Sequence, residues 1–425
     1  MLFAHTESGR RLRLAYCMNL HPAETLEGVI EAMRRVTVPL AKRLAHGETF
    51  GVGMYFPASL AAELAADPAK LAPLIELLVN ERLDPFTYNA FPAGGFGSVG
   101  LKERVFEPTW NEAARFDFTR DVARIAAALA SATGSGRDGR HVSISTHTGM
   151  HSSRVKTEAD SLSCARNFVR AASFLAQLEA DGAPRMVLAL EAEPRANCND
   201  TRELLAFMQS VRALVPEARE VLERHLGVCL DACHAAVEFE ASDRAIERAT
   251  EAGPLGKLQF SSALALPHPA SDEAGRAALL SMSEPAYLHQ VTGRVAGCGP
   301  QAMLRAHDLP EFQAELELAD SLWNTCSEWR CHFHVPVDLD QPLEGNSAGR
   351  LGTTRVIADE LLGLLSSQPE RWGTEELHVE IETYTWDLLA GPTRGEGNLI
   401  DGLTREYEHV LARLDEFGWS PVRSH

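Results

Sequence analysis

Five short segments of the sequence carry ligating side chains directly after an apolar run. The residues are Glu191 in MVLALEAEP, Asp231 and His234 in GVCLDACHA, Gln259 in GKLQFSSAL, His332 and His334 in CHFHVPVD, and Glu380 and Glu382 in HVEIETYTW. Such runs are typical of buried parallel strands, and in a parallel α/β barrel the C-terminal ends of the strands meet at one mouth. Carboxylate, amide and imidazole groups gathered at one mouth predict a site for a divalent metal ion.

The segment LDACHAAVEFE gives the sharpest of these signals. Asp231 closes an apolar strand, and His234 follows where the chain turns toward a helix. A buried aspartate without a nearby lysine or arginine is costly to keep charged unless a cation or hydrogen-bond donors compensate. The structural alternative is that Asp231 caps the next helix and that His234 is an ordinary surface residue.

Three segments carry two polar residues spaced two apart, which places both on one strand face. The pairs are Glu191 with Glu193, His332 with His334, and Glu380 with Glu382. Pro194 ends the first strand, so Glu191 is favoured over Glu193, while His334 and Glu382 are nearer the mouth in their segments. The alternative is a polar layer inside a barrel, satisfied by hydrogen bonds.

Nine short segments predict strands, and alanine- and leucine-rich stretches with helical spacing lie between them. The strand segments are 12–19, 50–56, 86–91, 142–146, 186–191, 228–231, 258–261, 332–335 and 377–383. Alternating strands and helices indicate parallel strands joined by right-handed crossovers. We predict an α/β fold, a (β/α)8 TIM barrel, although nine strands are one more than it needs. An open doubly wound sheet shares the local pattern, and the number of strands that end in ligands favours the barrel.

The length of 425 residues suits one elaborated domain over residues 1–425. We expect long loops at 91–110 and 264–306 and a C-terminal helical extension from about residue 400. The first loop, FPAGGFGSVGLKERVFEPTW, mixes glycine with aromatic residues, as a loop that covers a pocket does; an ordinary surface excursion is the alternative. Its GxGxxG spacing does not predict a dinucleotide site, because Pro108 breaks the segment that would have to be a helix.

The composition of the chain excludes some classes of binding partner and indicates a cellular location. The formal net charge of −19 repels phosphate backbones and anionic lipid, so we expect no nucleic-acid partner. The eight cysteines are scattered without paired CxxC spacing, which fits reduced thiols in the cytosol. No apolar run has the length of a membrane span, and the N-terminal segment lacks the apolar core of a signal sequence. We therefore predict a cytoplasmic protein without a membrane span.

The order of these ligands resembles the xylose isomerase-like TIM barrels, which include sugar isomerases, epimerases and endonuclease IV. The resemblance implies one divalent ion (Mn, Zn, Mg or Fe) held by Glu191, Asp231, Gln259 and Glu382. Where the sugar epimerases place a metal-binding histidine, this chain has Gln259, whose amide oxygen favours hard cations such as Mn or Mg. His332 or His334 could complete the ligand set instead.

Several phrases together resemble the EboE family of metabolite-traffic proteins, which is encoded beside other Ebo proteins and so implies them as partners. The phrases are YCMNLHPAETL, FPAGGFGSVGLKERVFEPTW, VSISTHTG, LDACHAAVEFE, LQFSSAL, HFHVPV and EIETYTWDLL. The family is implicated in moving precursors toward the cell envelope, and the resemblance does not supply a reaction.

Three functions compete on these signals. The first is an isomerase or epimerase of a small polyhydroxylated metabolite, in which Glu191 and Glu382 exchange a proton next to a carbonyl. Its predicted substrate-binding residues are the histidines His21, His147, His234 and His334. The second is a metabolite-binding escort protein without turnover. The third, cleavage of phosphodiesters, needs more histidines and a basic face, which the acidic composition disfavours.

Overall fold

Eight parallel strands form a closed barrel in the computed structural model, which describes residues 1–21, 23–137, 139–154, 157–299, 302–343, 348–386 and 396–423. The strands are β2 (Arg11–Cys17), β3 (Phe50–Tyr55), β4 (Leu83–Asn89), β5 (Val142–His147), β6 (Met186–Glu191), β7 (Leu226–Asp231), β8 (Leu255–Phe260) and β14 (Glu376–Ile381). Each pairs with the next in parallel, and β14 pairs with both β8 and β2, which closes the circle. The predicted (β/α)8 barrel is therefore confirmed.

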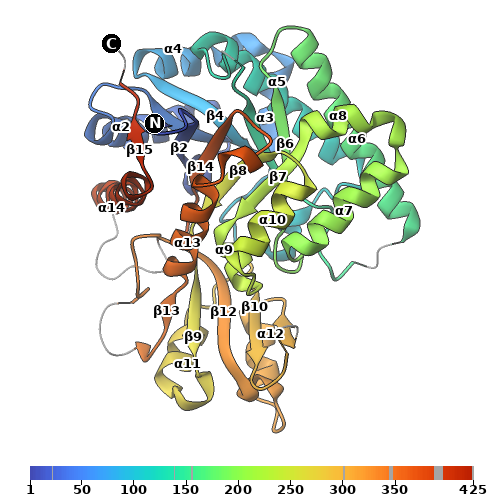
Figure 1. Cartoon of the computed structure of the whole chain (residues 1–425), viewed down its shortest axis with the longest axis vertical. Coiled ribbons are helices and arrows are strands. Elements are labelled where there is room, and N and C mark those ends of the chain that lie inside the picture. Colours follow the sequence, from blue (N-terminus) through green and yellow to red (C-terminus); the bar gives the residue numbers. More distant parts are fainter. Residues whose placement is uncertain are drawn as a thin grey trace.

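Helices surround the barrel (Figure 1). They are α1 (Leu26–Ala32), α2 (Val38–Leu44), α3 (Ala58–Ala66), α4 (Ala72–Asn80), α5 (Ala113–Thr133), α6 (Glu158–Ala180), α7 (Thr201–Leu214), α8 (Arg219–His225), α9 (Ala232–Val237), α10 (Ser242–Ala252), α13 (Arg355–Ser366) and α14 (Glu396–Glu416). The helix starts are capped locally: the Asp200 side chain, for example, accepts a hydrogen bond from the Glu203 amide at the start of α7. The barrel interior and the inner helix faces share one hydrophobic core.

A second sheet is inserted between β8 and α13. Its strands are β9 (Ser262–Pro267), β10 (Val291–Val295), β11 (Met303–Ala306), β12 (Cys326–Val335) and β13 (Gly352–Thr353), in the order β11-β10-β12-β9-β13 and antiparallel throughout. With α11 (Glu273–Leu280) and α12 (Leu309–Leu316) it encloses a hydrophobic cluster of its own, which includes Phe312, Trp323 and Trp329. We call residues 262–354 the inserted lobe.

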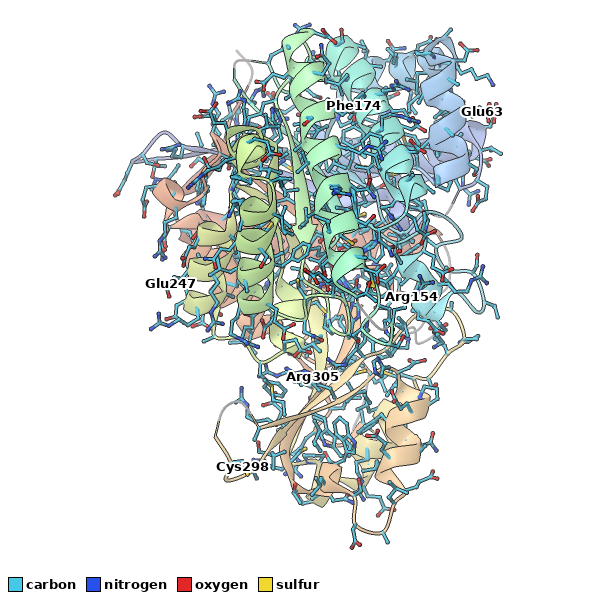
Figure 2. All side chains as sticks on the ribbon, turned by 90° about the vertical axis from the view of Figure 1, so that its right-hand side faces the viewer. Glu63, Arg154, Phe174, Glu247, Cys298 and Arg305 are labelled. Atoms are coloured by element: carbon cyan, nitrogen blue, oxygen red, sulfur yellow. The ribbon has the colours of Figure 1, made fainter. Side chains whose placement is uncertain are left out.

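The inserted lobe projects from one end of the barrel in two views turned by 90° (Figures 1 and 2), with Cys298 on its surface. It corrects two expectations. The segment 332–335 belongs to β12 and is not a barrel strand, which accounts for the ninth predicted strand. The segment 264–306 is not an irregular loop, because it contains most of β9, all of α11 and β10, and β11.

The two chain ends pair with each other beside the barrel. β1 (Leu2–His5) runs antiparallel to both β2 and β15 (Trp419–Pro421), and α14 lies just before β15, where a C-terminal helix was predicted. Within the parts of the chain that the structure describes, no helix combines the length and the apolar character needed to cross a membrane.

Candidate metal site and ligand cavity

Three carboxylates from successive parts of the chain converge at the C-terminal mouth of the barrel. Glu191 ends β6, Asp231 ends β7, and Glu382 directly follows β14. One ligand atom of each lies within 4.8 Å of the others, and all three side chains are buried. Glu191, Asp231 and Glu382 therefore lie together at the mouth, where the sequence predicted them.

The three carboxylates of this cluster repel one another electrostatically. Burial, together with the neighbouring carboxylates, raises the pKa of Glu191 and of Glu382 well above the usual range. Burial also raises the pKa of Asp231. A divalent ion would remove this mutual repulsion, so the donor set fits one.

Two oxygens of the cluster are left for such an ion. Asp231 Oδ1 accepts a hydrogen bond from the His234 amide at 2.8 Å and caps α9, and Glu382 Oε1 accepts from Asn19 Nδ2 at 2.8 Å. Asp231 Oδ2 and Glu382 Oε2 are buried and have no hydrogen-bond partner among the described residues. Asp231 therefore caps a helix with one oxygen, as the structural alternative predicted, and leaves the other free; the same alternative is wrong about His234, which is buried and not on the surface.

Gln259 lies next to Asp231 in the register of β7 and β8. Its Oε1 accepts from the Cys229 thiol at 2.7 Å, and its Nε2 donates to Asn89 Oδ1 at 3.4 Å. An amide oxygen has two lone pairs, so one remains for a cation. The structure places Gln259 beside the cluster and leaves its role as a fourth ligand a proposal.

A buried ion pair lies next to the cluster, inside the barrel. Lys257 Nζ contacts Glu380 Oε2 and donates to Asn89 Oδ1 at 2.9 Å, and both charged side chains are fully buried. Burial disfavours the charge on Lys257, but the Glu380 carboxylate outweighs it and the pKa of Lys257 is raised. Asn89 Nδ2 also donates to Glu380 Oε1 at 3.0 Å, so Glu380 belongs to a satisfied polar layer and Glu382 to the mouth.

Gly53 on β3 leaves the space that this pair occupies. A Cβ at position 53 would lie 1.8 Å from Glu380 Oε1, which no real contact allows. We expect Gly53→Ala to lower the free energy of unfolding by about 1–3 kcal/mol, measured by denaturant titration, because the pair must shift. Gly299→Ala is the control, since a Cβ there meets nothing within 4 Å; equal effects of the two substitutions would contradict the explanation.

Three histidines lie above the carboxylates. His234 comes from α9, and His332 and His334 come from β12 of the inserted lobe. His234 Nε2 lies 3.2 Å from His332 Nε2 and 3.2 Å from His334 Nε2. Burial lowers the pKa of His234 to about 3 and that of His334 to about 4, so these imidazoles are neutral near pH 7.

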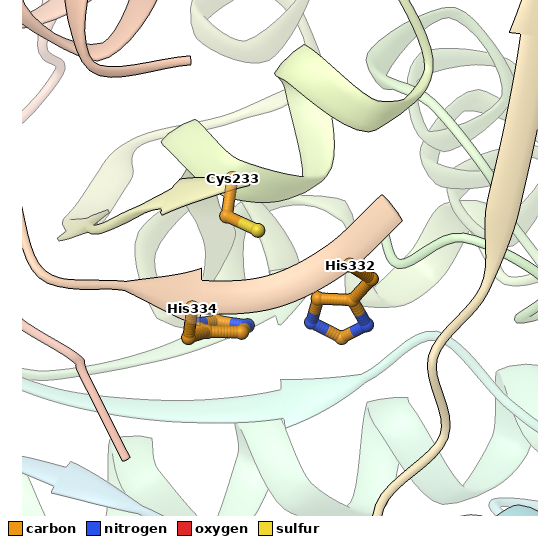
Figure 3. A group of neighbouring side chains, drawn as sticks. All are labelled: Cys233, His332 and His334. Atoms are coloured by element: carbon orange, nitrogen blue, oxygen red, sulfur yellow. The ribbon is translucent and has the colours of Figure 1, made fainter. Parts of the chain in front are cut away.

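The backbone of β12 is shaped to deliver the two imidazoles. The pairing of β12 with β9 is irregular between Cys331 and Val335, and His334 has φ of 44°, a conformation uncommon for a residue other than glycine. Cys233 lies near both rings, but Figure 3 shows the β12 ribbon between its thiol and the imidazoles. Cys233 does not line the cavity between the barrel and the inserted lobe.

These groups line one cavity, which lies between the barrel, the loop 91–110 and the inserted lobe. The barrel contributes Asn19, Asn89, Glu191, Gln259 and Glu382; the loop 91–110 contributes Phe91, Pro92, Phe96, Leu101, Lys102 and Val105; and the inserted lobe contributes Ala286, Tyr287, Leu288, His332 and His334. Glu193, His234 and Tyr384 complete the wall. Residues of the loop 91–110 therefore form part of the pocket wall.

Lys102 fastens this loop to the inserted lobe. Its Nζ donates to the carbonyl oxygens of Glu284 at 2.7 Å and Tyr287 at 2.6 Å, and lies 2.8 Å from Asp308 Oδ2. We expect Lys102→Ala to speed tryptic cleavage after the exposed Arg104 by about tenfold, because loss of charge-assisted bonds worth roughly 1.5 kcal/mol lets the loop open more often. Lys70→Ala, which removes a surface ion pair, is the control and should leave the cleavage rate unchanged.

Two predicted substrate-binding histidines do not line the cavity. His21 Nε2 lies 3.3 Å from the Tyr16 hydroxyl, outside the wall. His147 ends β5 but is enclosed by the rings of Phe91 and Phe106, and its Nδ1 accepts from the Gly149 amide. Neither histidine lines the cavity, and His147 Nε2 has no hydrogen-bond partner among the described residues, so a substrate role for His21 and His147 stays a prediction.

Other cavity residues were missed. Asn19 follows β2 and Asn89 ends β4, so both carried the same signal as Glu191, a polar residue after an apolar strand. Lys102, Tyr287 and the aromatic residues of the loop reach the cavity through long-range packing, for which the sequence has no local signal.

Comparisons with solved structures find sugar epimerases. The structure of L-ribulose 3-epimerase is similar at 11% identity, with 96% of this chain and 95% of that chain covered and a TM-score of 0.44. D-psicose 3-epimerase, crystallised in the presence of D-fructose, is similar at 11% identity, with 95% and 99% covered and a TM-score of 0.45. D-psicose 3-epimerase from Clostridium cellulolyticum H10 with D-tagatose has 12% identity, 95% and 98% coverage and a TM-score of 0.42.

No protein-family model matches the chain, and the search of curated proteins found no significant match. The barrel fold is established by the strand pairing itself.

Proposed function

We propose that this protein binds a small polyhydroxylated metabolite in the cavity and catalyses isomerisation or epimerisation next to a carbonyl. A divalent cation would be held by Glu191, Asp231 and Glu382, with Gln259 as a fourth ligand. The observation that carries the proposal is the set of three buried carboxylates with two unpartnered oxygens at the mouth. Such a set is unfavourable without a cation and is open to the cavity through Glu191 and Glu382.

The reaction divides between the cation and the side chains. When bound, the cation supplies polarisation of the substrate carbonyl, which acidifies the adjacent carbon. Glu191 or Glu382 removes the proton from that carbon, and the other returns one. Asn19 keeps Glu382 oriented through its hydrogen bond, and His234 and His334 offer Nε2 lone pairs to substrate hydroxyls.

The loop and the lobe supply the enclosure that this chemistry needs. Phe96, Tyr287 and Tyr384 pack edge to face or tilted against one another over the mouth, with ring centroids 4.9–5.4 Å apart. A covered cavity excludes bulk water from a carbanionic intermediate. The aromatic faces also suit the apolar side of a sugar ring.

We also propose that the protein acts in metabolite traffic like the EboE family, with other Ebo proteins as partners. What supports this is the location of the phrases that resemble the family: six of the seven contribute residues to the cavity wall or to the carboxylate cluster, among them Asn19, Lys102, Asp231, His334 and Glu382. The resemblance therefore concerns the binding site and not only the scaffold.

Exchange with solvent deuterium tests the catalytic proposal. The full-length protein is incubated with Mn²⁺ in D₂O with each of D-fructose, D-psicose, D-tagatose and L-ribulose, and the sugars are analysed by mass spectrometry and NMR. We expect one deuterium at a carbon next to the carbonyl of at least one sugar. Calorimetric binding of a sugar without deuterium uptake would instead support a metabolite-binding escort protein without turnover. If no ketose binds and none exchanges a proton, the assignment to this substrate class is overturned.

A further inference from the structure

We propose that Glu193, His234 and His332 form a second divalent-cation site, at the roof of the same cavity, which takes a borderline transition ion such as Zn²⁺. It lies beside the carboxylate site, with His234 Nδ1 3.2 Å from Glu191 Oε1, but the two sites share no ligand. Glu193 comes from the loop after β6, His234 from α9 and His332 from the inserted lobe. One ligand atom of each lies within 4.8 Å of the others, and all three side chains are buried.

Hydrogen bonds fix which ring nitrogen of each histidine carries the proton. His234 Nδ1 lies 3.0 Å from the carbonyl oxygen of Ala192, and His332 Nδ1 lies 2.6 Å from Gln290 Oε1. The Gln290 amide is oriented by its Nε2, which donates to the Pro194 carbonyl at 3.0 Å. A carbonyl oxygen can only accept, so each Nδ1 is the donor and each Nε2 carries a lone pair.

His334 has the same arrangement. Its Nδ1 lies 3.0 Å from the carbonyl oxygen of Glu382, so its Nε2 also carries a lone pair. The lone-pair nitrogens of His332 and His334 therefore both face that of His234 at 3.2 Å. Neutral acceptors at this distance repel one another, and no proton is available between them.

A metal ion explains the spacing. Zn–N bonds of 2.0–2.1 Å in a tetrahedral site separate two ligand nitrogens by about 3.3 Å. The distance between Nε2 of His234 and Nε2 of His332 is 3.2 Å, close to the separation expected for two nitrogen ligands of one zinc ion. Imidazoles that ligate a metal through Nε2 usually donate Nδ1–H to a carbonyl or carboxylate, as both do here.

Glu193 supplies the charge that such a site needs. Its side chain is 5% exposed and lines the cavity, and its Oε2 has no hydrogen-bond partner among the described residues. Its Oε1 receives a long hydrogen bond of 3.4 Å from Gln290 Nε2. Gln290 therefore touches both Glu193 and His332 and orients two ligands from one buried side chain of the lobe.

The two sites would differ in metal preference. Glu191, Asp231, Glu382 and Gln259 offer only oxygen, which suits Mg²⁺ or Mn²⁺, whereas two imidazoles and a carboxylate suit Zn²⁺ or Cu²⁺. A roof cation would stand between His234 and a substrate hydroxyl, so His234 would act on the substrate through the ion. His334, with its Nε2 beside the site, remains available for direct contact.

Zinc counting tests the second site. The full-length protein is stripped with chelator, equilibrated with Zn²⁺, desalted and measured by elemental analysis. We expect two Zn²⁺ per chain, falling to one in His332→Gln and in Glu193→Gln, with the exposed His268→Gln as the matched control that keeps two. Gln290→Leu, which removes no ligand, should weaken the second Zn²⁺ about tenfold. This variant keeps the test informative if His332→Gln fails to fold.

Pulsed EPR of the Cu²⁺-loaded protein gives the second readout. Two imidazole ligands should produce the remote-nitrogen modulation of two rings in the wild type and of one ring in His332→Gln. A single Zn²⁺ that Asp231→Asn removes and His332→Gln does not would overturn the roof site and leave the proposed function standing. A single Zn²⁺ with the opposite response would support the roof site, and Mn²⁺ binding would then decide whether the oxygen-only carboxylate site exists.

Discussion

Lys257→Met is expected to lower the free energy of unfolding by about 3–5 kcal/mol, the cost of leaving a buried charge without its partner. Lys257 and Glu380 are both fully buried inside the barrel, where water cannot replace the lost ammonium group. Removing it also leaves Asn89 Oδ1 without its 2.9 Å donor, and Asn89 lines the cavity. Urea titration followed by circular dichroism measures the change.

Two further variants test whether the loss of stability comes from the buried ion pair. The double variant Lys257→Met with Glu380→Gln should recover more than half of the lost free energy, because the uncompensated charge is then gone. Lys42→Met removes a largely exposed ion pair with Glu81 and should cost less than about 1 kcal/mol. A cost for Lys257→Met as small as that for Lys42→Met would show that the buried pair is not what stabilises the barrel interior.

Glu382→Gln is expected to slow deuterium exchange into the substrate at least 100-fold, within the 10²–10⁴-fold range of general acid–base groups. The amide keeps the shape of the side chain and its contact with Asn19 but can neither remove nor return a proton. Saturating Mn²⁺ in the assay compensates for a weaker cation site. Substrate affinity measured by calorimetry should change by less than tenfold, so the loss appears in the rate of exchange.

Glu63→Gln is the matched control for Glu382→Gln, because it makes the same chemical change on the surface, where Glu63 pairs with Lys70. Its exchange rate should equal that of the wild type. Exchange in Glu382→Gln within threefold of wild type would exclude Glu382 as the acid or base.

The sequence predicted the barrel because its signals are local. An apolar run, a polar residue at its end and a helix afterwards are repeated along the chain, and parallel pairing then brings Glu191, Asp231 and Glu382 together. The same local signals wrongly assigned His332 and His334 to a barrel strand. Polar and apolar residues alternate in CHFHV, and an antiparallel strand has the same alternation. Their direction is set by pairing with β9 and β10, whose paired residues lie 31 or more positions earlier in the chain. They nevertheless reach the mouth, because the inserted lobe folds over it.

The residues that the sequence misplaced or missed are positioned by long-range packing, which has no local signal. His147 does stand at the end of a barrel strand, but Phe91 and Phe106 enclose its ring, and such packing leaves no trace in residue order. Glu193 was set aside because Pro194 ends the strand, yet the loop after β6 turns its carboxylate back into the cavity. The strand-end rule thus finds residues on regular elements and fails where a loop or a distant sheet supplies the side chain.

Manganese binding to the stripped full-length protein, followed by EPR of free Mn²⁺, tests the carboxylate site most directly. We expect one Mn²⁺ per chain in the wild type and in His332→Gln, and an affinity at least 100-fold weaker in Asp231→Asn and in the double variant Glu191→Gln with Glu382→Gln. Wild-type protein that binds no Mn²⁺, or an Asp231→Asn variant that binds it as tightly as the wild type, would contradict a cation site built from these three carboxylates.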